Sequence, residues 1–159
     1  MSHVITILVA TMSGTAELVA DEVAAVFEDA AYIPRIMLMD KATSSDLKPG
    51  SYLICTSTHG TGDVPDNGKP FYSELEKSRP SLKGVLYGVI SLGDSMYPNT
   101  FCFGGKRFDE LFEALGAKRV GKRLEHDRRS GIYPEDIARE WAAEWITLLA
   151  RHSSEIQAS

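Results

Sequence analysis

The chain has 159 residues, 43% hydrophobic and 25% charged, which is typical of a globular protein that buries one core. Its net charge of −5 disfavours nucleic acid as a partner and suits a basic protein. The two cysteines, Cys55 and Cys102, are too few for a zinc site or a disulfide framework, so we expect reduced thiols and no metal. No export signal and no membrane-spanning apolar run is visible, so we expect a cytoplasmic protein that binds no membrane.

Short apolar runs alternate with amphipathic stretches along the chain. The apolar runs predict strands at residues 4–10, 33–39, 52–56 and 85–92, and a broken fifth strand at 118–124. The amphipathic stretches predict helices that begin at residue 15 and cover 71–77, 107–115 and 135–152. Nearly continuous apolar runs are typical of parallel strands buried on both faces, and Pro34 is typical of an edge strand.

This alternation predicts an α/β fold with a five-stranded parallel sheet and helices on both faces. We expect one domain over residues 1–152 and a frayed C-terminus over residues 153–159. In such a sheet a ligand binds beyond the carboxyl ends of the strands, so the loops after the first, third and fourth strands are the candidate site.

The first loop, residues 11–17, joins a buried strand to the start of a helix. Its hydroxyls, its glycine and the positive end of the helix dipole suit a phosphate, which neutral donors alone would hold because the loop contains no Lys or Arg. Simple capping of the helix by Ser13 or Thr15 is the alternative interpretation. No Gly-Lys-Ser/Thr sequence is present, which excludes a nucleotide triphosphatase loop.

The second loop, residues 57–67, contains two closely spaced glycines and His59. This segment is a candidate ligand-binding loop, and a solvent-exposed loop with a polar histidine is the alternative interpretation. Cys55 begins a segment with the spacing of a cysteine phosphatase loop, but Thr61 stands where such a loop needs an arginine, so that class is rejected.

The third loop, residues 92–102, combines glycine with aromatic side chains. Tyr97 is expected to stack on a flat ligand, which contributes roughly 0.5–1.5 kcal/mol beyond burial. Phe101 and Cys102 are expected to pack beneath the loop.

Together the three loops resemble those of the flavodoxins, most closely the MioC-type short-chain flavodoxins and the FMN domains of diflavin reductases. The motifs that carry the resemblance are Ser57-Thr58-His59-Gly60, Gly62-Asp63, Pro65-Asp66-Asn67, Phe71-Tyr72, Thr100-Phe101-Cys102, Gly116-Ala117-Lys118 and Pro134-Glu135-Asp136. The resemblance covers nearly the whole chain. It implies a flavodoxin-like three-layer sandwich with the strand order 2-1-3-4-5.

The resemblance also implies FMN as the cofactor and no catalytic residue in the protein. The implied cofactor-binding residues are Thr11, Met12, Ser13, Gly14, Thr15, Ala16, Ser57, Thr58, His59, Gly60, Gly62, Leu92, Gly93, Asp94, Tyr97, Phe101, Cys102 and Asp127. The first six of them would bind the phosphate.

The remaining implied roles concern the flavin ring. His59 takes the place of a ring-stacking tyrosine, Gly60 has the peptide beside flavin N5, and Tyr97 stacks on the opposite ring face. Asp127 matches an acidic position near the exposed flavin edge, while Arg128 and Arg129 beside it leave the charge of the docking partner open.

The function that follows is an electron carrier, monomeric and without turnover of its own, between a flavin reductase and a redox acceptor protein. The alternative is an FMN-dependent NAD(P)H quinone or azo-compound reductase, which shares the fold. A receiver domain is disfavoured, because Thr56 and Ser57 stand where a receiver needs an aspartate.

Overall fold

The computed structural model describes residues 3–11, 14–58, 64–96 and 102–158. Its strands are β1 (Val4–Ala10), β2 (Ile33–Leu38), β3 (Gly50–Thr56), β4 (Val85–Gly93), β5 (Lys118–Arg119) and β6 (Leu124–Asp127). Its α-helices are α1 (Thr15–Asp29), α2 (Lys69–Ser78), α3 (Phe103–Ala114) and α4 (Pro134–Ala158). Short 3-10 helices lie at η1 (Met39–Lys41), η2 (Ser44–Asp46), η3 (Asp66–Gly68) and η4 (Arg128–Ser130).

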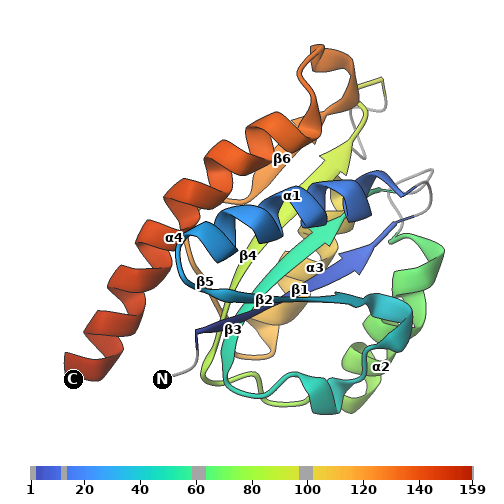
Figure 1. Cartoon of the computed structure of the whole chain (residues 1–159). Coiled ribbons are helices and arrows are strands. Elements are labelled where there is room, and N and C mark those ends of the chain that lie inside the picture. Colours follow the sequence, from blue (N-terminus) through green and yellow to red (C-terminus); the bar gives the residue numbers. More distant parts are fainter. Residues whose placement is uncertain (1–2, 12–13, 59–63, 97–101, 159) are drawn as a thin grey trace.

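The strands form one sheet in the order β2-β1-β3-β4-β5, with β6 also pairing with β4 (Figure 1). Every pairing is parallel. The predicted strand order is therefore confirmed. The fifth strand is broken, as predicted, into β5 and β6, but its second half continues to Asp127, beyond the predicted end at Leu124.

Helices cover both faces of the sheet, which gives three layers. Figure 1 shows α1 and α4 in front of the sheet and α3 behind it. One core cluster packs α1 and α4 against the sheet, and a second packs α2 and α3 against the opposite face. Trp145 is buried in the first cluster, where its indole N–H donates to the carbonyl of Val120 at 3.0 Å. Its ring stacks on that of Trp141, with 5.8 Å between the ring centroids, so the two tryptophans pack α4 against the sheet.

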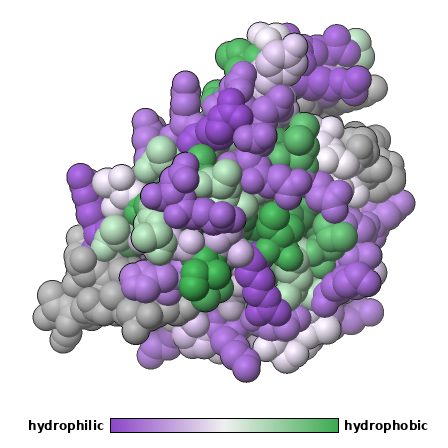
Figure 2. Space-filling model, in the orientation of Figure 1, coloured by the Kyte–Doolittle hydropathy of each residue, from purple (hydrophilic) through white to green (hydrophobic). Residues whose placement is uncertain are grey.

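The outer sides of α1 and α4 are polar. Figure 2 shows hydrophilic residues over most of this face, with a patch of apolar residues near its centre. Among the described residues, no helix has the length and apolar character needed to cross a membrane.

Two helix bounds differ from the sequence prediction. Helix α3 begins at Phe103 instead of residue 107, and its first turn contains Gly104 and Gly105, which lie too close to Ser57 and to β4 for any side chain. A Cβ on Gly105 would lie 2.5 Å from the hydroxyl oxygen of Ser91. Helix α4 continues to Ala158, whereas the division into a domain at 1–152 and a frayed end at 153–159 stays a prediction.

Strand β2 is the open edge of the sheet, as Pro34 predicted. The N–H of Ile33 donates to the carbonyl of His3 at 2.8 Å, so residue 33 directs its backbone groups towards β1. Backbone groups of successive residues in a strand point to opposite sides. The nitrogen of Pro34 therefore faces outward, where its missing proton costs the sheet no hydrogen bond.

Candidate cofactor site

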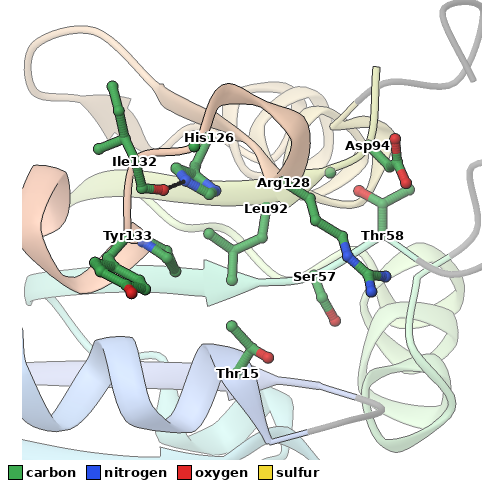
Figure 3. Close-up of a pocket in the computed structure, with 12 residues that line it drawn as sticks. Thr15, Ser57, Thr58, Leu92, Asp94, His126, Arg128, Ile132 and Tyr133 are labelled. Atoms are coloured by element: carbon green, nitrogen blue, oxygen red, sulfur yellow. Dashed lines mark hydrogen bonds between the residues drawn. The ribbon is translucent and has the colours of Figure 1, made fainter. Parts of the chain in front are cut away.

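A cleft of about 610 Å³ lies over the carboxyl ends of the central strands (Figure 3). This volume is within the roughly 300–1,000 Å³ of small-molecule sites. Its lining comes from the start of α1, the ends of β3 and β4, and the segment between β6 and α4: Thr15, Ser57, Thr58, Leu92, Gly93, Asp94, His126, Arg128, Gly131, Ile132, Tyr133 and Pro134. The position agrees with the rule that places ligands beyond the carboxyl ends of parallel strands.

The start of α1 presents backbone N–H groups at one side of this cleft. The residue before the helix is Gly14, with a φ of 86°, and a glycine has no side chain to cap the helix. Its own N–H donates to Oγ1 of Thr11 at 3.0 Å, and the N–H of Thr11 donates to Asn67 at 2.8 Å, which holds the turn in place. Because the positive end of the helix dipole lies at such a terminus, this arrangement suits an anion, while Ser13, one of the two candidate capping residues, lies outside the described residues.

Ser57 supplies a buried hydroxyl that the described residues leave without a hydrogen-bond partner. Its backbone N–H donates to the carbonyl of Ala10 at 3.0 Å, which fixes the residue at the end of β3. Next to it, Oγ1 of Thr58 accepts from the N–H of Gly104 at 3.1 Å. An unsatisfied buried hydroxyl costs roughly 1–3 kcal/mol, so a polar ligand in the cleft would relieve a real penalty. The site therefore fits a ligand with hydroxyl and phosphate oxygens.

Two carboxylates join the loop after β4 to the loop after β6. Asp94 accepts from the N–H of Met96 at 2.9 Å and from Nε of Arg129 at 2.6 Å. Asp127 accepts from the N–H of Ser95 at 3.0 Å and from the N–H of Arg129 at 3.0 Å. The N–H of Met96 and then Arg129 lower the pKa of Asp94, and the hydrogen bonds from Ser95 and Arg129 lower the pKa of Asp127. Both carboxylates therefore stay ionised and hold the two loops together.

The segment from His126 to Pro134 forms one side of the cleft. Of this segment, the sequence predicted only Asp127 as a cofactor-binding residue. The ring of His126 is buried, and its Nε2 donates to the carbonyl of Ile132 at 2.6 Å, a bond drawn in Figure 3. This bond holds Ile132 and Tyr133 at the cleft, where they remain 52% and 70% exposed. The signal was available, because this segment also follows a parallel strand and must lie at the same edge of the sheet.

Cys102 is buried beside the cleft and does not line it. Its Sγ donates to the carbonyls of Ser91 at 3.4 Å and His126 at 3.7 Å, and burial raises its pKa to about 12. Gly93 must be a glycine here, since a Cβ would lie 2.7 Å from the backbone nitrogen of Cys102. Cys102 is thus a packing thiol, as expected.

The structure brings together most of the predicted residues that it describes. Those that line the cleft are Thr15, Ser57, Thr58, Leu92, Gly93 and Asp94, and those next to it are Thr11, Gly14, Ala16, Cys102 and Asp127. Met12, Ser13, His59, Gly60, Gly62, Tyr97 and Phe101 lie outside the described residues. The roles of all these residues towards the cofactor stay predictions.

Fold and cleft together define a class of protein: a doubly wound parallel α/β protein with a ligand-sized cleft at the carboxyl ends of its strands. Comparison with known proteins narrows this class. The flavodoxin family model matches residues 7–141. The chain therefore belongs to the flavodoxin family, whose members bind FMN and carry electrons.

Individual relatives agree with this assignment. The chain is 35% identical over 148 residues to protein MioC of Escherichia coli O157:H7, across 91% of this chain and 97% of that protein. It is 38% identical over 146 residues to flavodoxin YqcA of Pectobacterium carotovorum subsp. carotovorum, across 90% and 95% of the two chains. The solved structure of a cysteine-to-alanine mutant of a flavodoxin from Pseudomonas aeruginosa superposes with a TM-score of 0.81 at 35% identity, covering 92% of this chain and 99% of that chain.

These matches confirm the resemblance, the fold class, the cofactor and the electron-carrier function that the sequence implied. They do not favour the alternative of an FMN-dependent quinone or azo-compound reductase.

Proposed function

We propose that the cleft is the FMN site of this electron carrier, with the phosphate at the start of α1 and the ribityl hydroxyls along the end of β3. The observation that carries this proposal is the buried Ser57 hydroxyl, which has no partner among the described residues and lies in the wall of the cleft. The first turn of α1 offers backbone N–H donors for the phosphate, and the residue at its N-cap, Gly14, has no side chain that could compete for them.

FMN supplies the one-electron chemistry when it is bound, and the protein binds and orients it. Leu92 gives the cleft an apolar wall, and Gly93 lets Cys102 pack directly against the end of β4. Asp94, fixed by Arg129, keeps the loop after β4 at the cleft. The residues therefore act by binding and positioning, and none of them is required as an acid or a base.

The partners of this carrier are a flavin reductase upstream and an acceptor protein downstream, with the chain acting as a monomer in the cytoplasm. The buried, free thiols of Cys55 and Cys102 suit a reducing compartment. Exposed Met96, Ile132 and Tyr133 give partners an apolar surface next to the cofactor cleft.

Ser57→Ala tests the proposal, because it should preserve the stability of the apoprotein while it weakens the binding of FMN. Removing an unsatisfied buried hydroxyl should leave the free energy of unfolding of the apoprotein unchanged or raise it. FMN affinity, measured by quenching of flavin fluorescence, should fall about ten-fold, the loss of one hydrogen bond of roughly 1.4 kcal/mol.

Ser91→Ala is the matched control. The Ser91 hydroxyl donates to the carbonyl of Cys102 at 2.9 Å and accepts from the N–H of Gly105 at 3.1 Å, so its loss should destabilise the apoprotein. A Ser57→Ala variant that binds FMN as tightly as the unaltered protein would contradict the proposed site.

A further inference from the structure

One cation, Arg128, enters the cofactor cleft from a segment of the chain far from the phosphate loop. It begins η4, directly after β6, and lines the cleft together with Thr15 and Ser57. Figure 3 shows its side chain extending from the upper wall into the cleft, with the guanidinium towards the side that Ser57 and Thr58 line. A cationic group therefore lies in a cavity whose opposite wall contains the start of α1.

Within the described part of the chain, the Arg128 side chain makes neither a hydrogen bond nor an ion pair, unlike several other arginines nearby. The paired arginines are Arg119 and Arg123 on Asp109, Arg129 on Asp94, and Arg139 on Glu22 and Asp136.

The two acids nearest in the sequence are already engaged by other donors. Asp94 receives Nε of Arg129 and the N–H of Met96. Asp127 receives the N–H groups of Ser95 and Arg129. The charge of Arg128 acts on Asp94 only at a distance: after the N–H of Met96 and Arg129, it is the last of the causes that lower the pKa of that carboxyl. The guanidinium N–H donors of Arg128 are thus available to a ligand.

The cleft combines this guanidinium with the positive end of the α1 dipole and with the donor-capable hydroxyl of Ser57. An anion placed between these two positive features would interact favourably with both. Asp94 is an anion of the same cleft, but its carboxylate is held by Arg129 and the N–H of Met96. The dianionic phosphate is the permanent anion of FMN, and a guanidinium matches phosphate oxygens in a two-point geometry.

We propose that Arg128 is a ligand of the cofactor phosphate, which it approaches from the side opposite α1. This inference rests on the proposed FMN site. It revises the sequence expectation that neutral donors alone hold the phosphate, since the cation comes from the last loop of the sheet and not from residues 11–17.

Dissociation constants of FMN and riboflavin at two salt concentrations test the proposal, because riboflavin lacks the phosphate. Arg128→Gln should weaken FMN about ten-fold or more, the loss of a charge-assisted hydrogen bond, and should leave riboflavin binding unchanged. The salt dependence of FMN affinity should decrease in this variant. Arg128→Lys, which keeps the charge, should retain part of the affinity.

Arg151→Gln is the matched control, since it makes the same change in net charge at an exposed position of α4 outside the cleft lining. It should bind FMN as the unaltered protein does. Equal FMN affinity of Arg128→Gln and Arg151→Gln would overturn the role of Arg128, and so would an equal loss of FMN and riboflavin in Arg128→Gln. Failure of the unaltered protein to bind FMN would instead overturn the proposed site itself.

Discussion

The hydroxyl of Tyr87 donates a hydrogen bond of 2.6 Å to the carboxylate of Asp109, which is buried on α3. The other carboxylate oxygen accepts from Arg119 and, at 2.6 Å, from Arg123. Arg119 ends β5, and Arg123 directly precedes β6. One buried charge therefore connects β4, α3 and both halves of the broken strand.

Replacing Asp109 with Asn should destabilise the fold strongly. The change removes the counter-charge of Arg119 and Arg123. Breaking a buried ion pair costs roughly 3–5 kcal/mol of stability. We expect a value towards the lower end of this range, because both arginines are partly exposed. Urea unfolding measures the difference. Tyr87→Phe removes only the neutral donor and should cost about 1–2 kcal/mol. An Asp109→Asn variant as stable as the unaltered protein would show that the cluster contributes little.

The two buried thiols should be unreactive in the native protein. Burial raises the pKa of Cys55 and of Cys102 from 9.0 to about 12, and only the thiolate is a good nucleophile. At neutral pH a thiol reagent should therefore label both residues only as fast as the protein unfolds. Labelling in denaturant is the control, and rapid labelling under native conditions would contradict the buried placement.

The same raised pKa values predict a loss of stability in alkali. The unfolded chain ionises these thiols near pH 9, whereas the folded protein keeps them neutral until about pH 12. Their contribution is thus complete below pH 9 and is lost as the pH rises towards 12. Free energies of unfolding measured across this range should fall, and Cys55→Ala should reduce the slope. A slope equal to that of the unaltered protein would exclude Cys55 as a source.

FMN affinity should decrease in acid because Asp94 and Asp127 hold the loops of the cleft. Their pKa values lie below the ordinary 3.8, so the two carboxylates are ionised above that pH and become protonated as the pH falls below it. Titration of FMN fluorescence against pH measures the release. Asp94→Asn should show weakened binding already at neutral pH, and full affinity in this variant would mean that the Arg129 contact does not shape the site.

Alanine substitutions at the two glycines that begin α3 should affect FMN binding and folding stability to different degrees. A Cβ on Gly104 would collide with the carbonyl oxygen of Ser57, so Gly104→Ala should displace the end of β3 and weaken both FMN binding and folding. A Cβ on Gly105 meets the side chain of Ser91 instead, away from the cleft lining. Gly105→Ala should therefore lower the melting temperature with a smaller effect on FMN affinity. Equal effects of the two variants on affinity would contradict this separation.

Sequence periodicity predicted the sheet because its strands are buried on both faces and must be almost wholly apolar. It misplaced the start of α3, because Gly104 and Gly105 are typical of a loop and are needed here for tertiary contacts that no local pattern reports. It also missed Arg128 and Tyr133, since loop residues obey no period and their side chains meet the cleft only after folding. Motifs next to strand ends were found, whereas residues contributed by the last loop were not.

The open edge at β2 bears on how the protein behaves when it is concentrated. Ile33 and Ile36 are 61% and 40% exposed on a strand with one unpaired side, a combination that favours β-pairing between molecules and aggregation. The outward-facing nitrogen of Pro34 has no proton to offer to an incoming strand, and the exposed charge of Arg35 opposes a second copy of itself. Pro34, together with Arg35, thus protects the edge strand against self-association. An electron carrier needs this protection because it must diffuse freely between its partners.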